Sequence, residues 1–376
     1  MRIINICISN PYIEGFAYQE NILTDYFLDE GLETTIIGAN VVPSYINSKK
    51  IKPGIYSDNG KKIIRINCLR ITTEFIIPFK LYKQLKHERP DIVFHHNLNC
   101  TSLIICTIYK IFNPGIILLV DNHADNINCS KNKLWKFVYA GILVRFSGKF
   151  ASLFVRKFYG VTYSRCDYLH ETYGIRKSKI DFLPIGADIK AAGSIIENTF
   201  ELRNKHKIPT EAFVYVSGGK MGKDKGTDNL VKVINEIQVP HIHVVLVLFG
   251  SFNDKETEKL AAESKNVIYL GWCDHKTSLS ILKLADVAVW PVHHTTLIED
   301  AISVNTPLLI RKTRTTEHLI EGNGIYLDST DYNELFTKTC SFLDKNPKEY
   351  FIDGCNNMRE KIDYNSLARK VISDCK

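Results

Sequence analysis

Short apolar runs alternate along the chain with longer stretches of mixed apolar and polar residues. Apolar runs of this kind, rich in Val, Ile and Phe, are typical of strands that are buried on both faces. The mixed stretches have helical patterns, so the alternation predicts βα units and parallel sheets. Strands are predicted at residues 2–9, 33–37, 63–66, 92–95, 116–120, 158–163 and 179–183, and again at 213–216, 243–249, 267–269, 287–290, 308–310 and 324–326.

The strands form two series, separated by a stretch at 189–200 that loses strand character and indicates a linker. We therefore predict an α/β protein with two Rossmann-like, doubly wound domains that face each other across a cleft. The first domain is expected at 1–189 and the second at 190–359, followed by a terminal helix at about 360–376. A chain of 376 residues is long enough for two such domains with sizeable cores.

Composition narrows the class of protein. Hydrophobic residues make up 45% and charged residues 24% of the chain, which is typical of a soluble globular protein. No apolar run approaches the roughly 18 to 20 residues that span a bilayer, and the run at 2–9 is too short for a signal peptide. The ten cysteines show no Cys-x-x-Cys pair or metal-ligand spacing, which favours free thiols in a reducing compartment. We therefore expect a cytoplasmic protein.

The sharpest candidate for chemistry is the segment SGGKMGKDKG at 217–226, which lies between a predicted strand and a helical pattern at 229–234. Glycines let the backbone approach a ligand, N–H groups at a helix start point outward, and lysines neutralise negative charge. The segment therefore predicts a phosphate site, although a lysine-rich surface turn is an equally ordinary explanation. It is not a P-loop, because no Gly-Lys-Ser/Thr sequence closes it.

This segment resembles the donor site of retaining glycosyltransferases with the GT-B fold, especially family 4, the glycosyl transferases group 1. The family has Gly-Arg-Leu, three variable residues and then Lys-Gly, and this chain has Gly219-Lys220-Met221 and Lys225-Gly226. The family also has one Glu, seven residues, and a second Glu within Glu-Ala-Met-Ala-x-Gly-x-Pro-Val. Counting back from Pro307 places Asp300 at the second Glu, with Glu299 beside it, whereas Val292 stands at the first.

The resemblance implies transfer from a nucleoside-diphosphate sugar with retention, without a metal ion or another cofactor. A departing diphosphate needs preorganised cations and N–H groups, and the implied catalytic cations are Lys220 and Lys225. Asp300 or Glu299 is expected to accept hydrogen bonds from ribose hydroxyls, with a helix N-cap as the alternative for Asp300. Trp272 is expected near the base, with a core aromatic as the alternative. The implied donor-binding residues are Gly15, Gly219, Trp272, His293, His294, Thr295, Thr296, Glu299 and Asp300.

The first half of the chain resembles the family more loosely. Gly15 follows the first predicted strand, where the family has a glycine-rich loop near the donor diphosphate, and Glu20 matches that loop's acid. His123 follows the strand predicted at 116–120, and ligand sites in open α/β sheets lie beyond the carboxyl ends of strands. The resemblance implies that His123 hydrogen-bonds to the transferred sugar, with a loop histidine that caps the next helix as the alternative. It also implies that the terminal helix crosses back onto the first domain.

The segment 131–157 carries seven cations and no acid, interleaved with aromatic and aliphatic residues, in a chain of net charge +7. At about 100° per residue, Arg145, Lys149 and Arg156 fall on one helical face. Such a segment can lie on an anionic membrane surface, and an ordinary helix with a solvated basic edge is an equal alternative. The protein is therefore expected to lie peripherally on the inner face of the plasma membrane. No nucleic-acid motif accompanies the basic residues, so no nucleic-acid partner is expected.

Together these patterns predict a glycosyltransferase that moves a sugar from a nucleoside-diphosphate sugar to a glycan or lipid-linked glycan. A role in bacterial surface polysaccharide synthesis is implied by the resemblance and the basic segment. One alternative is a nucleotide-sugar or partner-binding protein that has lost catalysis, because Val292 replaces a carboxylate. Another is a sugar-nucleotide epimerase of the same architecture, which would need more acid/base carboxylates than the sequence offers.

Overall fold

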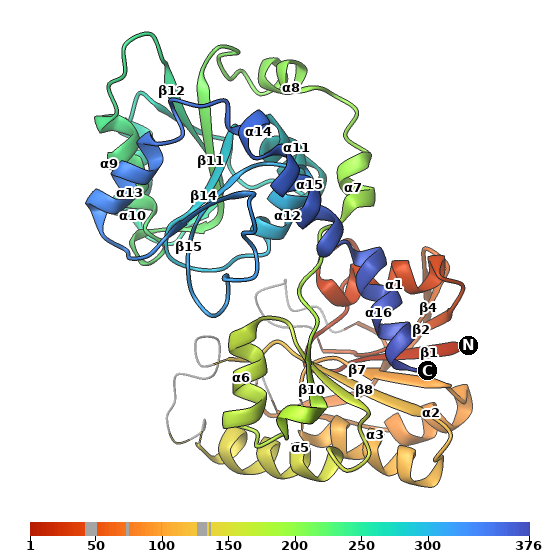
Figure 1. Ribbon diagram of the computed structural model, residues 1–376. Helices are drawn as coiled ribbons and strands as arrows, with labels where there is room; N and C mark the ends of the chain where they lie inside the picture. The colour runs from red at the N-terminus through yellow and green to blue at the C-terminus, as the bar shows by residue number, and fades with distance from the viewer. Residues whose placement is uncertain (42–50, 73–74, 99, 126–133, 135–136) are drawn as a thin grey trace. The chain divides into compact units, whose positions relative to one another are not determined.

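The computed structural model of the 376-residue chain describes residues 1–41, 51–72, 75–98, 100–125, 134 and 137–376. It divides into two compact units (Figure 1). Unit 1 comprises Met1–Pro184 and Tyr364–Lys376, and unit 2 comprises Ile185–Asp363. The sequence-based boundaries were placed after residue 189 and near residue 360, whereas the structure divides after Pro184 and after Asp363.

Unit 1 contains an eight-stranded sheet in the order β10-β9-β8-β7-β1-β2-β4-β3. All neighbouring strands are parallel except β3 and β4. The strands are β1 (Arg2–Cys7), β2 (Glu33–Ala39), β3 (Gly54–Asp58), β4 (Lys61–Ile66), β7 (Ile92–His95), β8 (Ile117–Asn122), β9 (Lys157–Gly160) and β10 (Ile180–Phe182), and a separate hairpin pairs β5 (Cys68–Arg70) with β6 (Ile76–Pro78). The order reverses between β1 and β7, which makes the carboxyl ends of these strands the expected ligand position.

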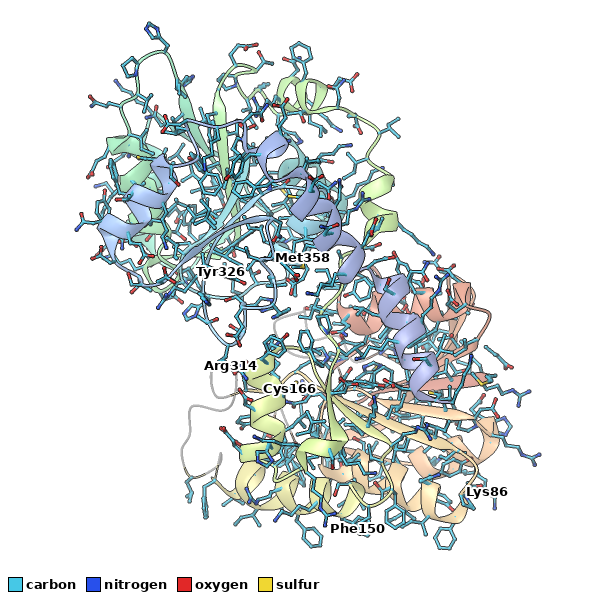
Figure 2. All side chains as sticks on the ribbon, in the orientation of Figure 1. Lys86, Phe150, Cys166, Arg314, Tyr326 and Met358 are labelled. Atoms are coloured by element: carbon cyan, nitrogen blue, oxygen red, sulfur yellow. The ribbon has the colours of Figure 1, made fainter. Side chains whose placement is uncertain are left out.

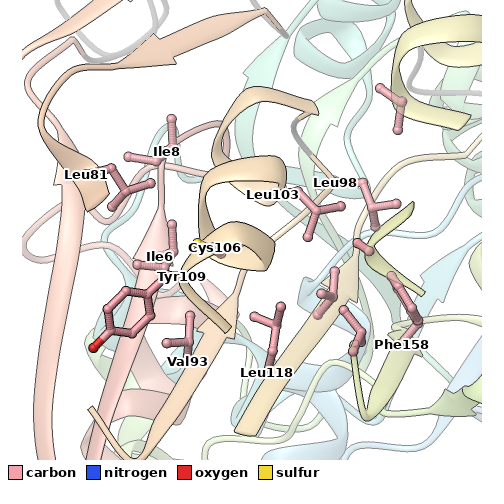
Figure 3. Packing of buried hydrophobic residues seen from close by; sticks show 14 of the residues in the cluster. Ile6, Ile8, Leu81, Val93, Leu98, Leu103, Cys106, Tyr109, Leu118 and Phe158 are labelled. Atoms are coloured by element: carbon pink, nitrogen blue, oxygen red, sulfur yellow. The ribbon is translucent and has the colours of Figure 1, made fainter. Parts of the chain in front are cut away.

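Helices cover both faces of this sheet. On one face, Ile6, Val93 and Leu118 of the sheet pack against Leu103 and Tyr109 of α3 (Figure 3). The other face carries α1 and the C-terminal helix α16, which lie side by side in Figure 1. The helices of unit 1 are α1 (Gln19–Asp29), α2 (Leu81–Glu88), α3 (Cys100–Phe112), the π-helix η2 (Phe137–Val144), α5 (Arg145–Ala151), α6 (Tyr163–Glu171), the 3-10 helix η3 (Lys177–Lys179) and α16 (Tyr364–Asp374).

Specific contacts attach α16 to unit 1. The ring of Tyr364 packs against that of Tyr26 on α1, with 5.8 Å between centroids. Near the other end of the helix, Asp374 accepts hydrogen bonds from Tyr159 Oη at 2.6 Å and Lys157 Nζ at 2.8 Å. The last helix of the sequence therefore completes the core of the first unit.

Unit 2 contains a fully parallel six-stranded sheet in the order β13-β12-β11-β14-β15-β16. Its strands are β11 (Phe213–Met221), β12 (Val244–Phe252), β13 (Val267–Tyr269), β14 (Val287–Trp290), β15 (Leu308–Arg311) and β16 (Gly324–Leu327). Counted from β11, this is the 3-2-1-4-5-6 order of a Rossmann fold, with its switch point between β11 and β14. Its helices are α7 (Ile189–Gly193), α8 (Thr199–Lys205), the 3-10 helix η4 (Lys223–Lys225), α9 (Thr227–Glu236), α10 (Lys255–Glu263), α11 (His275–Leu284), α12 (Leu297–Ser303), α13 (Tyr332–Cys340), α14 (Pro347–Tyr350) and α15 (Ile352–Lys361).

Two sequence-based assignments are wrong in detail. The stretch 189–200 is not a plain linker, because Asp188 caps a short helix, α7, through the backbone N–H of Ala191. The phosphate-site segment is not all turn, because parallel pairing of β11 with β12 continues as far as Met221.

No helix in the described ranges is long and apolar enough to cross a membrane.

Candidate functional site

The main candidate site lies in unit 2, at the switch point of its sheet. The end of β11 and the segment that follows β14 enclose a pocket of about 210 Å³, which we call the phosphate pocket. Its lining residues are Ser217, Gly218, Lys220, Met221, Lys225, Thr227, Trp290, His293, His294 and Thr295. Parallel strands that diverge at this point leave room for a ligand.

Two glycines at the end of β11 allow other groups to approach its backbone closely. A Cβ at Gly218 would lie 2.5 Å from the ring of Phe249, so a larger residue has no room there. Gly219 has φ +100°, a conformation that side chains disfavour. The indole N–H of Trp290 donates to the carbonyl oxygen of Gly218 at 3.1 Å and fixes this part of the strand against β14.

The lysines of the segment have different surroundings. Lys223 pairs with Glu256 and is therefore engaged outside the phosphate pocket. Lys225 lines the pocket, and its nearest carboxylate is that of the adjacent Asp224 at 3.8 Å. Lys220 lines the pocket and has no ion-pair partner in the part of the chain that the structure describes. Two of the lysines thus leave positive charge at the pocket.

A second pocket of about 270 Å³ adjoins the first and shares Lys220 with it. Its other lining residues are Gly219, Phe249, Gly250, Ser251, Trp272, Cys273, Ser278 and Leu297. The side chain of Trp272 is 79% exposed, which excludes the alternative that Trp272 is a core aromatic. An exposed aromatic ring beside an apolar floor offers a stacking surface for a flat ring system.

The loop from Pro291 to α12 brings His293, His294 and Thr295 to the phosphate pocket. Nε2 of His294 lies 2.7 Å from Oε1 of Glu299; the side chain of Glu299 is buried and that of His294 is largely buried. Burial lowers the pKa of His293, and the nearby Lys225 lowers it further. Thr296 is the N-cap of α12. His293, His294 and Thr295 form the polar wall of the pocket opposite the end of β11.

Val292 turns away from this wall. It lines a different pocket, together with Lys223 and Asn229, and packs so tightly on Gly226 that a Cβ there would lie 2.8 Å from Val292 Cγ2. None of the residues that line the phosphate pocket is a carboxylate. The position that the resemblance assigns to the first family Glu therefore has no counterpart in this pocket.

Asp300 pairs with a histidine of another helix. Its Oδ1 lies 3.1 Å from Nε2 of His275 on α11, and it is absent from the linings of the phosphate pocket and the adjoining pocket. Burial raises the pKa of Asp300. Burial lowers the pKa of His275, but the hydrogen bond to Asp300 and the charges of the nearby aspartates together outweigh burial and raise it. Asp300 lies inside α12, so the alternative of a helix N-cap is wrong.

Unit 1 carries a second polar cluster, at the carboxyl ends of β7 and β8. Asp121 Oδ2 lies 2.6 Å from Nδ1 of His96 and 3.4 Å from Nε2 of His123, while Oδ1 accepts from the backbone N–H of Asn97 at 2.7 Å. Burial alone would raise the pKa of Asp121, but His96 and His123 hold it well below its usual range. Burial lowers the pKa of His123, but the charge of Asp121, its hydrogen bond and the charge of Glu20 together outweigh burial and raise that pKa.

Other polar or loop residues of unit 1 surround this cluster or the first loop. His95 is buried, bonds to Ser102 at 2.8 Å, and has its pKa lowered to about 4 by burial. Glu20 is buried in the first turn of α1, and burial raises its pKa. Gly15 has φ +79° with open space around it, as in a plain turn. Sequence reasoning missed the contact between His96 and Asp121. The available signal was that His96 directly follows β7 and that Asp121 lies near the end of β8.

The basic segment at 131–157 is organised differently from the prediction. Residues 131–133 and 135–136 lie outside the described residues. The helix α5 ends at Ala151, so Arg156 does not share a helical face with Arg145 and Lys149. Arg145 donates to the carbonyl oxygens of Glu171 and Thr172, which anchors it to α6. Lys149 remains exposed on α5.

Large apolar side chains are exposed around the same helices. They are Ile108, Ile111, Phe112, Phe137, Ile142, Leu143, Phe146 and Leu153. We call these residues the apolar surface of unit 1. They come from α3, η2, α5 and the turn after it, and Figure 2 shows Phe150 of α5 along the outer border of the unit. Contiguous exposed apolar side chains mark interaction sites in soluble proteins.

The two units together have the GT-B architecture of two Rossmann-like domains. A glycosyltransferase from Rickettsia africae ESF-5 superimposes with a TM-score of 0.71 at 14% identity, over 100% of this chain and 97% of that chain. Sucrose-phosphate synthase from Thermosynechococcus elongatus gives a TM-score of 0.69 at 15% identity, over 99% and 97%. HepE from Anabaena, in complex with UDP, gives 0.71 at 13% identity, over 99% of each chain. The predicted fold class is confirmed.

The family model described as "Glycosyl transferases group 1" matches residues 198–365. This match covers the strands and helices that form both pockets of unit 2. No curated protein matches the sequence significantly. The donor-side half of the resemblance thus has independent support from the family model, and the fold has support along the whole chain.

Proposed function

We propose that the protein is a retaining glycosyltransferase that takes a sugar from a nucleoside-diphosphate sugar. The observation that carries the proposal is the pair of adjoining pockets at the switch point of unit 2, which share Lys220. A nucleoside diphosphate has a flat base at one end and two charged phosphates at the other. An aromatic pocket next to a cationic pocket matches that chemistry.

The base is assigned to the pocket that contains Trp272, and the diphosphate to the phosphate pocket. Lys220 stands where the two meet, and Lys225 lies in the phosphate pocket. During transfer the bond between the anomeric carbon and the diphosphate oxygen breaks, and that oxygen keeps the electron pair. The two lysines stabilise the added charge, which is usually the largest contribution to catalysis of this type. The acceptor hydroxyl oxygen forms the new bond to the anomeric carbon, and its proton passes to the departing diphosphate.

Similar structures support the same class of donor. HepE, which shares the fold at 13% identity, has structures in complex with UDP and with UDP-glucose. We therefore rank UDP-sugars first among the candidate donors. His123 is assigned a hydrogen bond to the transferred sugar, because Asp121 raises the pKa of His123 and so favours a protonated, donating imidazole. No role for a metal ion enters this proposal.

A binding protein without catalysis is the second candidate function. It is favoured by one observation, the absence of any carboxylate from the lining of the phosphate pocket. Such a protein would bind the donor through the same lysines and would not release nucleoside diphosphate from it. A sugar-nucleotide epimerase is less favoured, since acid/base chemistry on the sugar needs such carboxylates beside the donor.

Nucleotide binding tests the proposed donor site. Wild-type protein is expected to show a rise in melting temperature with one of UDP, GDP or ADP, because a ligand that binds only the folded state stabilises it. Lys225→Ala is expected to reduce that rise, while Lys223→Ala, whose lysine pairs with Glu256, serves as the matched control. A flat response of well-folded protein to all three nucleotides would contradict the proposal.

We propose further that the acceptor is a glycan or lipid-linked glycan and that the apolar surface of unit 1 rests on the inner leaflet of an anionic membrane. The side chains of Phe112 and Phe146 are 72% and 70% exposed, and burying apolar area of that size in the lipid interface is favourable. Exposed Lys149 adds attraction to anionic headgroups. A role in surface polysaccharide synthesis would follow from such an acceptor.

Liposome co-sedimentation tests this surface. The variant carrying Phe112→Ser and Phe146→Ser is expected to bind vesicles of phosphatidylcholine and phosphatidylglycerol about tenfold more weakly than wild type, because two buried rings are lost. Ile55→Ser, on the exposed edge strand β3, is the control for loss of an exposed apolar side chain. Equal binding by all three proteins would contradict the membrane assignment.

A further inference from the structure

The pair formed by His294 and Glu299 in unit 2 has a feature that packing does not explain. The two side chains are 9% and 1% exposed, and 2.7 Å separates Nε2 of His294 from Oε1 of Glu299. The other carboxylate oxygen, Oε2, is buried and has no hydrogen-bond partner in the described part of the chain. Burying a half-satisfied carboxylate costs stability. The neighbours of Glu299 on α12, Ile298 and Ala301, are core residues, so an apolar side chain would suit the position better.

The two members of the pair have different access to a ligand. His294 is part of the wall of the phosphate pocket, whereas Glu299 is not. A carboxylate oxygen accepts hydrogen bonds and an imidazole N–H donates them, so we assign Nε2 of His294 as the donor to Oε1 of Glu299. This contact fixes the orientation of the ring and leaves Nδ1 as its second polar atom. An anionic ligand in the pocket accepts hydrogen bonds, so it can use Nδ1 of His294 only as a donor, with the carboxyl group of Glu299 on the other side of the ring.

We infer that His294 is a catalytic residue that donates a hydrogen bond from Nδ1 to the departing diphosphate, and that Glu299 is the positioning residue that holds it. The inference rests on the proposed function. When the bond from the anomeric carbon breaks, the diphosphate oxygen keeps the electron pair, and His294 keeps its proton and stabilises that charge alongside Lys220 and Lys225. Glu299 thereby acts through His294 and not on the ribose hydroxyls, the role that the resemblance implies for it.

Replacing His294 and replacing Glu299 are expected to cause coupled losses of nucleotide binding and turnover. His294→Ala and Glu299→Gln are each expected to weaken binding of the nucleoside diphosphate selected from UDP, GDP and ADP, and to slow its release from the corresponding donor, by about ten- to hundredfold, as for loss of a hydrogen bond to a charged group. The double variant is expected to be no worse than His294→Ala, because Glu299 has no separate contact with the ligand. Calorimetric titration and turnover assays on the full chain measure both quantities.

Two further variants separate the pair's role from a structural one. His294→Gln retains a donor and is expected to recover part of the rate lost in His294→Ala, which a structural defect would not allow. Glu197→Gln, which breaks the surface pair with Lys205, is the control for neutralising a glutamate elsewhere in unit 2 and is expected to behave as wild type. Melting temperatures confirm that each variant is folded.

The outcomes distinguish this inference from the function on which it rests. If wild type binds none of the three nucleotides, the proposed function and this inference fall together. If wild type binds and turns over the donor while Glu299→Gln matches wild type, or while the losses of the single variants multiply in the double variant, the positioning role of Glu299 is overturned. The proposed function would then stand without it.

Discussion

Replacing Lys220 with alanine is expected to lower the rate of nucleoside diphosphate release by about 10²- to 10³-fold, the usual effect of removing one preorganised group from a developing negative charge. Lys220 lines both pockets of unit 2 and has no ion-pair partner among the described residues, so its charge is available to a ligand. The measurement is steady-state turnover of the donor whose nucleotide binds the wild-type protein.

Matched variants make this prediction specific. Lys223→Ala removes a lysine from the same segment, but that lysine pairs with Glu256, so near wild-type turnover is expected. Lys220→Arg keeps the positive charge and introduces the residue that the resembled family has at this position. Its turnover rate is expected to stay within about tenfold of wild type. If Lys220→Ala and Lys223→Ala had the same small effect, the segment would be a solvated turn rather than a phosphate site.

Replacing Asp121 with asparagine is expected to lower the pKa of His123, because a nearby opposite charge favours the charged imidazolium and the substitution removes that charge. In the wild-type protein that pKa is raised, so the ion pair with Asp121 is present at low pH and is lost as pH rises through it. The variant is therefore expected to lose its protonated His123 at a lower pH than wild type. NMR titration of the His123 ring measures the shift directly.

Asp121→Asn is also expected to lower the free energy of unfolding, by an amount that becomes smaller as the pH falls. The pKa of Asp121 is depressed in the folded protein, so its contribution is fully present above the unfolded pKa, roughly 4, and is lost as pH falls from there through the folded pKa, which lies well below it. Removing one member of a buried pair costs about 3 to 5 kcal/mol. Denaturation at pH 7 and at about pH 2 is expected to show a smaller difference between the variant and wild type at the lower pH, which lies below the unfolded pKa.

Asp181→Asn provides the comparison for the Asp121 variant. Asp181 is partly exposed and pairs with Lys157 and Lys370, away from the histidines. It is expected to leave the titration of His123 unchanged. An unchanged pKa of His123 in the Asp121→Asn protein would show that the carboxylate does not control this histidine.

The parallel strands could be predicted from the sequence because both faces of a central strand are buried, which leaves a continuous apolar run such as 213–216 or 287–290. The strand β3 was missed because it is an exposed edge strand of mixed composition. The extension of β11 through Gly219 and Lys220 was missed as well. Backbone pairing with β12, which leaves no apolar pattern, holds that part of the strand.

The sequence predicted which segments form the site, but not the directions in which their side chains point. Sequence reasoning brought Lys220, Lys225 and His294 to one end of the sheet, and they line one pocket. Counting residues from Pro307 could not show that Val292 turns toward Gly226, because the loop before α12 sets that direction. The register of β7 with β8 pairs His95 with Val120, so the next residues of both strands meet. That pairing explains the contact between His96 and Asp121, and it becomes visible only once the strand order is known.

Turnover of a nucleoside-diphosphate sugar by the wild-type protein tests the central claim most directly. The full chain would be incubated with UDP-, GDP- and ADP-sugars in the presence of bacterial glycan and lipid-linked glycan acceptors, with release of nucleoside diphosphate and transfer of labelled sugar both followed. We expect catalytic release with one type of donor, strongly reduced in Lys220→Ala, and a product with the anomeric configuration of the donor. Tight binding of a nucleotide sugar without release or transfer under any of these conditions would contradict it and identify a binding protein.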